Sequence, residues 1–373
     1  MPAMLPAISL FSGAGGMDVG FHMAGFNVQW ANDIDPIACE TFALNGLGRI
    51  RCGDLQELWA ELDEIGDPAI VFGGPPCQGF SVAGKMDPSD SRSSQMARFF
   101  DVVEKKQPLA FVCENVKGLA VLSRWALFRH RLFERIGRMG YQHALVVLNA
   151  ADFGVPQARE RMFLIGFRAD IFDFSGLNLR DALISALGGL KTGAPPMSEL
   201  IKQVGRAGNP KNAQICNAKV TFARNPVLRK SPYAGMLFNG AGRPVKPFGA
   251  SSTLPASMGG NKTPIVDEDE IFEGKKSYVE QYHRHLRRGG APRSGNAPKR
   301  LRRLTVDECL AIQTFPSDFK MAGRQSSMYR QIGNAVPCKL AEAVARTVRL
   351  FIEEGRHAAE ELLAGQDEIR LAS

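Results

Sequence analysis

The chain has no long apolar run and no paired cysteines, and each absence argues against a class of protein. No stretch approaches the roughly 18 consecutive apolar residues that cross a bilayer, and the segment before Phe11 lacks the features of a secretory signal. We therefore expect a cytoplasmic protein without membrane contact. The seven scattered cysteines form no Cys-x-x-Cys pair, so neither a disulfide framework nor a zinc site is indicated.

The six histidines show no metal-ligand spacing either, and we expect no metal. His283 and His285 stand in a basic, polar run, where exposure to solvent is the natural expectation.

Acidic residues are missing from Leu200 to Val266, although the chain as a whole has a net charge of +8. A solvated surface usually mixes both signs, so a segment of one sign favours contact with phosphate groups. A nucleic acid is therefore the expected partner. The basic residues of this tract are Lys202, Arg206, Lys211, Lys219, Arg224, Arg229, Lys230, Arg243, Lys246 and Lys262.

The first half of the chain alternates short apolar runs with longer amphipathic ones, which predicts a doubly wound, mostly parallel α/β sheet. Helices are expected at 94–106, 125–139 and 339–354, where apolar residues recur at intervals of three and four. Strands are expected near 7–11, 28–33, 69–73, 109–114, 144–148 and 162–167.

Composition predicts the domain boundaries. After about Gly189 the chain becomes rich in Gly, Pro, Asn and basic residues, which indicates a second, smaller domain of loops and short strands. We expect a ligand-binding domain at 1–189, an irregular domain at 190–300, and a segment at 301–373 that returns to complete the first domain.

The run from Phe11 to Gly16 follows a predicted strand and opens a helix, so its glycines would let backbone amides approach a ligand. The second strand ends at Asp33, near the spacing at which an acidic residue binds a ribose. Together these features predict a nucleoside cofactor. The alternative for Asp33 is a capping role at the helix that begins at Pro36.

Cys77 lies in a Gly- and Pro-rich loop, Gly73 to Ser81, which follows another strand. Such a loop presents a side chain rather than burying it. A cysteine is more often a small core residue, but this setting favours a nucleophile that needs activation near neutral pH.

Glu114 ends an apolar strand at the same sheet edge, where the alternatives are a helix cap and a carboxyl group that keeps its proton and donates it. Arg159 and Arg161 alternate along an extended segment, so they would share one face. They either pair with Glu160 at the surface or aim two guanidinium groups at one site.

Read in order, these segments resemble the cytosine-5 DNA methyltransferases over nearly the whole chain. Five blocks occur in the family's order, and their combination is far more specific than any one of them. The blocks are Phe11 to Gly16, Gly73 to Ser81, Glu114 to Val116, Gln157 to Arg161 and Gln331 to Pro337.

The resemblance implies that Cys77 attacks carbon 6 of cytosine and that Glu114 binds ring nitrogen 3 and the amino group. Arg161, supported by Arg159, would hold the base carbonyl. The cofactor would be S-adenosylmethionine, which leaves as S-adenosylhomocysteine. Its site would be lined by Phe11, Ser12, Gly13, Ala14, Gly15, Gly16, Asp33, Ile34, Asp54, Leu55, Pro76, Asn334, Ala335 and Val336.

The same resemblance implies a target-recognition domain in the basic region and a substrate of double-stranded DNA whose cytosine is rotated out of the helix. The loop after Cys77, through Arg92, would close over that base. Expected DNA contacts are Gln78, Ser81, Lys85, Arg229, Lys230, Arg243, Thr253 and Leu254.

Three residues depart from the family's usual pattern: Ser9 replaces an acid, Asp33 replaces the commoner glutamate, and Ile34 replaces an aromatic residue. None of them touches the reacting atoms, so activity is expected to survive. The compact size resembles bacterial restriction-modification enzymes, which implies a partner endonuclease and a monomer. The alternatives are a transfer-RNA methyltransferase, although the Cys-Phe-Thr element of that branch is absent, and a DNA-binding regulator without activity.

Overall fold

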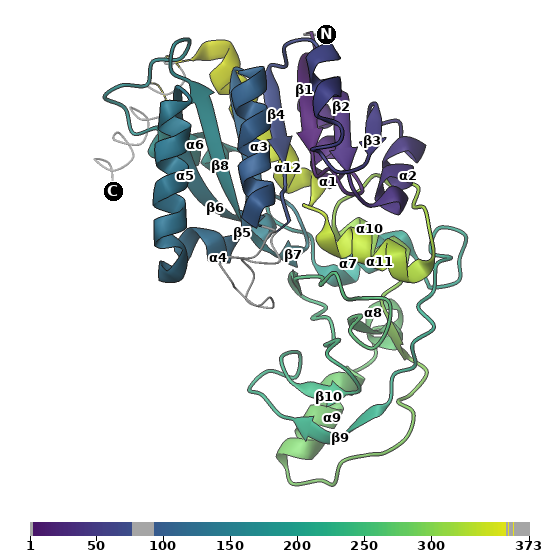
Figure 1. The fold of residues 1–373 in the computed structure, drawn as a ribbon. Helices are drawn as coiled ribbons and strands as arrows, with labels where there is room; N and C mark the ends of the chain where they lie inside the picture. The colour runs from purple at the N-terminus through teal and green to yellow at the C-terminus, as the bar shows by residue number, and fades with distance from the viewer. Residues whose placement is uncertain (1–2, 77–92, 356, 358–360, 362–373) are drawn as a thin grey trace. The chain divides into compact units, whose positions relative to one another are not determined.

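The computed structural model describes residues 3–76, 93–355, 357 and 361, and it divides into two compact units (Figure 1). Unit 1 contains residues 1–153, 160–192 and 338–373, and unit 2 contains residues 154–159 and 193–337. The chain thus leaves the first unit for six residues, returns to it, and leaves again for the long second insertion.

Unit 1 is built on a seven-stranded sheet in the order β3-β2-β1-β4-β5-β8-β6. Every neighbouring pair from β3 to β5 is parallel, whereas β8 runs antiparallel to both β5 and β6. The strands are β1 (Leu5–Leu10), β2 (Phe26–Asp33), β3 (Ile50–Cys52), β4 (Ile70–Gly73), β5 (Ala110–Val116), β6 (Tyr141–Asn149) and β8 (Glu160–Arg168).

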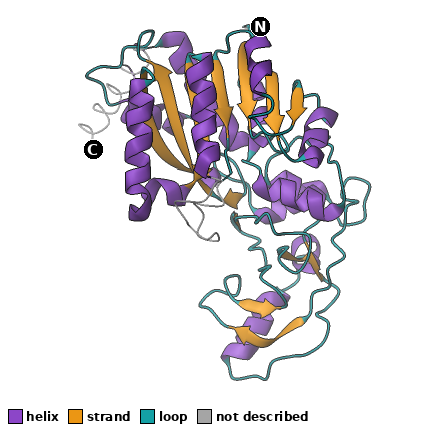
Figure 2. Ribbon diagram, viewed as in Figure 1, coloured by secondary structure: helices purple, strands orange, loops and turns teal. Residues whose placement is uncertain are grey.

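Helices cover both faces of this sheet (Figure 2). On one face, Phe99, Phe100 and Ile136 of α3 and α5 pack with Phe111 of β5 in a large buried cluster. On the other, α1 packs along α12, and Phe21 of α1 stacks on Phe72. The helices are α1 (Gly16–Met23), α2 (Pro36–Leu44), α3 (Ser93–Lys106), α4 (Lys117–Val121), α5 (Ala126–Arg138), α6 (Leu179–Gly189) and α12 (Cys338–Glu354).

The expected doubly wound, mostly parallel α/β fold is confirmed, and all six expected strands are present. The helices expected at 94–106, 125–139 and 339–354 correspond to α3, α5 and α12. The sequence did not predict β3, which has three residues, none of them buried.

Unit 2 combines three two-stranded sheets with five short helices, and the three helices within residues 190–300 were not expected. Its core gathers Phe238, Tyr282 and Leu286 around the β9–β10 pair. The sheets are β7 (Gln157–Ala158) with β11 (Ser251–Ser252), β9 (Phe222–Val227) with β10 (Met236–Phe238), and β12 (Ile265–Asp267) with β13 (Leu301–Arg303). The helices are α7 (Met197–Val204), α8 (Glu268–Glu273), α9 (Tyr278–Arg287), α10 (Val306–Ile312) and α11 (Gln325–Asn334).

The return to unit 1 begins at Cys338 rather than near residue 301. Residues 301–337 cluster with unit 2 because β13 pairs with β12 and α10 packs on α7.

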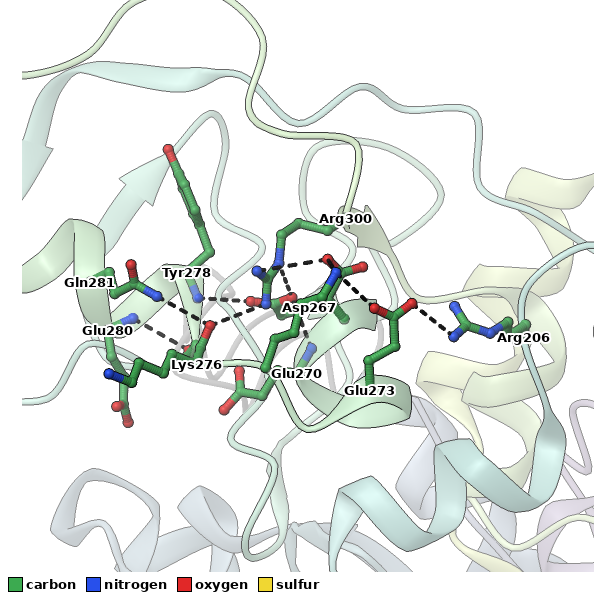
Figure 3. Close-up of polar contacts among 12 residues, drawn as sticks. Arg206, Asp267, Glu270, Glu273, Lys276, Tyr278, Glu280, Gln281 and Arg300 are labelled. Carbon is green, nitrogen blue, oxygen red and sulfur yellow. Dashed lines mark hydrogen bonds and ion pairs between the residues drawn. The ribbon is translucent and has the colours of Figure 1, made fainter.

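Asp267 is the centre of a polar network that joins β12, α8 and α9 (Figure 3). Its carboxylate accepts hydrogen bonds from the N–H groups of Glu270 and Tyr278 and from Nε of Arg300, at 3.3, 2.9 and 2.6 Å. At the rim of the network, Glu273 pairs with Arg206 of the basic tract at 3.1 Å. One buried carboxylate therefore fixes the start of both helices.

The six cysteines in the described part of the chain are all free, and five of them are buried. Among the described residues, no helix is long and apolar enough to cross a membrane.

The contact between α1 and α12 leaves no room for a side chain at Gly20. An added Cβ would lie 2.5 Å from the carbonyl oxygen of Cys338 and 2.6 Å from the backbone nitrogen of Glu342. We expect Gly20→Ala to lower the free energy of unfolding by about 1–3 kcal/mol, although alanine favours helix. Urea unfolding measures it.

The matched control is Gly137→Ala in α5, where an added Cβ would meet no heavy atom within 4 Å. This change should stabilise the protein by up to about 1 kcal/mol. Stabilisation by both substitutions would contradict the close packing of α1 on α12.

Candidate active site

Glu114 and Arg161 form an ion pair at the carboxyl edge of the unit 1 sheet, with Nε of Arg161 at 2.9 Å from Oε1 of Glu114. Both side chains are mostly buried. The antiparallel direction of β8 explains the pairing, because Arg161 is the second residue of β8 and lies opposite Val116 at the end of β5. A carboxylate and a guanidinium therefore meet where the parallel strands end, the edge at which such sheets bind ligands.

The loop that leads to Cys77 is fixed against this pair. Nδ2 of Asn115 donates to the carbonyl oxygen of Pro75 at 3.1 Å. A Cβ at Gly74 would lie 2.9 Å from Oε2 of Glu114, so only glycine lets the backbone pass this close to the carboxylate. Pro76, the last described residue before the gap, is exposed. Cys77, Gln78, Ser81, Lys85 and Arg92 lie outside the described residues.

Glu114 is not a helix cap, because the cap of α4 is Val116, without a side-chain hydrogen bond. Glu160 pairs with Lys117 at 2.7 Å.

The two arginines have different partners. Arg161 pairs with Glu114 in unit 1, whereas Arg159 belongs to unit 2. The Arg159 guanidinium is 1% exposed and donates to the carbonyl oxygens of Leu254, Gly333 and Asn334 at 3.2, 3.0 and 3.4 Å. The alternation fails because Arg159 stands between two strands, β7 and β8, rather than within one.

The glycine loop from Phe11 to Gly16 is held by Asp33. Oδ2 of Asp33 accepts the N–H of Gly13 at 2.7 Å, and Oδ1 accepts the N–H of Asp35 at 2.8 Å. Burial raises the pKa of Asp33 above its usual value. The cap of α2 is Asp35, so the capping alternative for Asp33 is wrong. Phe11, with a φ of 55°, is strained for a bulky residue, as backbone at functional sites often is.

These residues fit a nucleoside cofactor. Each carboxylate oxygen of Asp33 keeps a lone pair for a hydroxyl group. Ile34, which follows it, is 68% exposed, so its apolar side chain is open to contact with a ligand. The first turn of α1 has no side-chain cap, since Gly15 occupies that position, and its N–H groups favour an anion.

The remaining expected cofactor residues differ in exposure. Ala14, Gly15, Gly16, Leu55 and Val336 are buried, and Ser12, Asp54 and Ala335 are half-buried. Asn334 is exposed.

Sequence reasoning missed Asp18, which lies in the first turn of α1 and is 1% exposed. Both of its carboxylate oxygens are buried without a hydrogen-bond partner of good geometry in the described structure, although Ser9 lies beside the carboxyl group. Burial, with a smaller contribution from Asp33, raises the pKa of Asp18 to about 7. An acidic residue inside a glycine-rich helix start was the available signal.

In unit 2 all ten basic residues of the acid-free tract are exposed. Arg206 is the only one with a carboxylate partner in the part of the chain that the structure describes. Arg229, Lys230 and Arg243 are thus presented to solvent, as phosphate contact requires. His283, expected at the surface, is instead buried, and its Nε2 lies 2.9 Å from the carbonyl oxygen of Arg229.

Thr253 is exposed, and its hydroxyl donates to the carbonyl oxygen of Ala158 at 2.9 Å. Leu254 is fully buried, and its side chain packs inside unit 2.

Residues 5–349 match the model of the C-5 cytosine-specific DNA methylases, nearly the whole chain. The chain belongs to this family. It is therefore a DNA (cytosine-5-)-methyltransferase of the restriction-modification type. Methyltransferases of this family use S-adenosylmethionine, and the site described above fits it.

Two relatives illustrate the similarity. The chain is 33% identical to the Type II methyltransferase M.MthTI of Methanothermobacter thermautotrophicus, over 92% of this chain and 97% of that protein. It is also 33% identical to the Type II methyltransferase M1.HphI of Haemophilus parahaemolyticus, over 92% and 86%.

Solved structures show the same fold. A putative DNA modification methyltransferase encoded within an Escherichia coli prophage superposes with a TM-score of 0.64 at 21% identity, covering 94% of this chain and all of that one. The S. pombe Dnmt2 methyltransferase gives 0.64 at 18% identity, over 94% and 98%.

The raised pKa of Asp18 predicts a pH-dependent stability. The folded protein keeps this proton up to about pH 7, whereas the unfolded chain releases it near pH 3.8. Stability should therefore fall as pH rises from 4 to 7 and level off above that. Asp18→Asn removes the penalty, so the variant should gain a few kcal/mol relative to wild type between pH 5 and pH 8.

Urea unfolding at several pH values measures this difference. Asp67→Asn, at an exposed position, is the control and should show no such trend. A difference between Asp18→Asn and wild type that is constant with pH would mean that Asp18 is ionised throughout.

Proposed function

We propose that this enzyme transfers a methyl group from S-adenosylmethionine to carbon 5 of a cytosine that is rotated out of duplex DNA, through a covalent bond to Cys77. The observation that carries the proposal is the Glu114–Arg161 pair, whose carboxylate lies against the backbone of Gly74, three residues before Cys77. A nucleophile, a carboxyl group and a guanidinium then converge on one base.

Carbon 5 of cytosine is a weak nucleophile, which explains why these residue types are needed. The Cys77 thiolate adds to carbon 6, and nitrogen 3 takes up the proton that Glu114 carries. The product is a neutral enamine with a nucleophilic carbon 5. Glu114 stabilises that protonated ring and contacts the amino group, and Arg161 holds the base carbonyl. When bound, S-adenosylmethionine supplies an electrophilic methyl group on a sulfonium. Loss of the carbon 5 proton to a base then releases the Cys77 thiolate, and nitrogen 3 returns its proton to Glu114.

Arg161 has a second task in this proposal. Its ion pair orients Glu114 before the base arrives, so that little rearrangement is needed during the reaction. Arg159 acts through the backbone, since its guanidinium holds the carbonyl groups of Leu254 and Gly333. It supports the recognition element rather than the base.

For the cofactor, we propose that the Phe11–Gly16 loop binds the charged end, that Asp33 binds the ribose and that Ile34 packs on the adenine. Asp54, Leu55 and Pro76 complete the contacts from unit 1. The family resemblance adds Asn334, Ala335 and Val336 to the proposed cofactor contacts.

For the DNA, we propose that unit 1 carries catalysis and unit 2 carries target recognition, with phosphate contacts from Arg229, Lys230 and Arg243. Thr253 would lie near the flipped nucleotide. Contacts from Gln78, Ser81 and Lys85 belong to the same proposal. A cytoplasmic monomer working beside a restriction endonuclease fits the Type II relatives.

The first test is transfer of labelled methyl groups from S-adenosylmethionine to unmethylated duplex DNA. We expect label in DNA for the wild type. Cys77→Ser should lose turnover by at least about 10⁴-fold because a hydroxyl group replaces the thiolate, and Glu114→Gln should lose at least about 10²-fold. Both variants should still bind DNA.

Cys52→Ser is the matched control, since Cys52 is an exposed free cysteine in the described structure. It should keep full activity. Turnover retained by Cys77→Ser would remove the covalent step from the proposal, and label found in transfer RNA alone would replace the substrate.

The basic tract predicts a steep salt dependence of DNA binding. Each phosphate contact contributes about 0.9 to the slope of log affinity against log salt. Replacing Arg229, Lys230 and Arg243 together by alanine should therefore reduce that slope by about 3. Binding to unmethylated duplex DNA in the presence of S-adenosylhomocysteine measures it.

A triple variant with the same charge change, Arg124, Arg131 and Arg138 to alanine in and beside α5, is the control. Its slope should stay near that of the wild type. Equal slopes for the two triple variants would mean that net charge, and not this tract, attracts DNA.

A further inference from the structure

Two buried glutamine side chains in unit 2 hydrogen-bond to each other. Nε2 of Gln157 donates to Oε1 of Gln313 at 2.8 Å, and both residues are fully buried. The other ends of the two amides reach backbone groups far apart in sequence. Oε1 of Gln157 accepts the N–H of Leu254 at 2.9 Å. Nε2 of Gln313 donates to the carbonyl oxygens of Ile332 and Ala335 at 2.6 and 3.1 Å.

The amide pair therefore forms a continuous path from Leu254 to residues 332–335. One end is the recognition element, whose exposed Thr253 also bonds to Ala158. The other end is the stretch that the proposed function assigns to the cofactor. Arg159 makes a second path between the same two ends, through its bonds to Leu254, Gly333 and Asn334.

The backbone next to Gln313 adopts a strained conformation, which indicates that the position of Gln313 is fixed by its surroundings. Gln313 caps the C-terminus of α10, and Thr314 follows with a φ of 59°, a left-handed conformation that disfavours a β-branched residue. The N–H groups of Thr314 and Phe315 return to the carbonyl oxygens of Ala311 and Leu310, which completes a helix-ending motif that usually uses glycine. Strain of this kind persists where the surrounding structure requires it.

We propose that Gln157 and Gln313 are positioning residues that couple DNA binding at Thr253–Leu254 to cofactor binding at residues 334–336. The proposal rests on the proposed function. Because an unsatisfied buried amide is costly, a shift of Leu254 is transmitted through both glutamines to the carbonyl groups of Ile332 and Ala335. DNA and cofactor should each raise the affinity of the enzyme for the other, by the same factor.

The test measures the dissociation constant of S-adenosylhomocysteine with and without saturating unmethylated duplex DNA. For the wild type we expect the ratio of the two constants to be at least about fivefold. We compare Gln157→Met, Gln313→Met and the double variant. Methionine matches the size of glutamine but makes no strong hydrogen bond.

The double variant separates coupling from folding. Each single change leaves the other amide unsatisfied and should lower thermal stability, whereas replacing both partners by apolar groups of similar shape is close to neutral. We expect the double variant to unfold near the wild-type temperature, to bind S-adenosylhomocysteine alone within about twofold of wild type, and to lose at least about threefold of the DNA-dependent ratio.

Asn212→Leu is the control, because Asn212 is a fully buried amide of unit 2 that bonds to Gly205 and Glu308, outside this path. It should lose stability and keep the ratio. A double variant with the wild-type ratio would overturn the proposal, as would equal loss in the control or a wild-type ratio of one. Failure of the proposed function would appear separately, as a wild-type protein that transfers no methyl group to DNA.

Discussion

The antiparallel pairing of β8 with β5 is the constraint on which the candidate site depends. In a wholly parallel sheet, the residue at the start of a strand lies at the edge opposite to the end of its neighbour. Because β8 is reversed, its first residues lie beside the last residues of β5, and Arg161 reaches Glu114. Glu114 thereby gains a cationic partner at the edge where the parallel strands end. The first residues of a parallel strand would lie at the opposite edge and could not reach it.

Backbone carbonyl groups, rather than carboxylates, receive the most buried cations of unit 2. Arg303, 1% exposed, donates to carbonyl oxygens of Asn239, Gly242 and Thr263, as Arg159 does to its own set. A buried guanidinium offers five donors in a fixed fork, so one side chain can join three chain segments that have few regular strands between them. The Asp267 carboxylate likewise joins several segments, because its oxygens accept hydrogen bonds from Glu270, Tyr278 and Arg300. A domain with short strands and a small apolar core thus gains its order from buried polar side chains with several partners each.

The sequence was most informative where apolar periodicity and loop composition agree. The strand positions in unit 1 could be predicted from short apolar runs. The glycine loop and Glu114 could be predicted as candidate site residues because they stand at the ends of predicted strands. The short helices α7, α8 and α9 were missed because the many glycine, proline and basic residues around them obscure the helical spacing of their apolar residues in the sequence. The separate partners of Arg159 and Arg161 could not be predicted, since they depend on the break between β7 and β8. Asp18 was overlooked because its place in a glycine-rich helix start, although visible in the sequence, does not show that its carboxyl group is buried.

The residues that sequence reasoning overlooked are polar groups without charge partners in the interior. Gln157 and Gln313 read as ordinary surface residues in a sequence, since glutamine is mostly exposed in proteins. Their burial is intelligible only through the contact between them, 156 residues apart along the chain. A pair of apolar side chains would fill the same space, but it would not hold three backbone segments in fixed positions relative to one another through directional hydrogen bonds. The cost of burying two amides is then offset by the geometry that they fix, because they hold the proposed recognition element and the stretch proposed for the cofactor together.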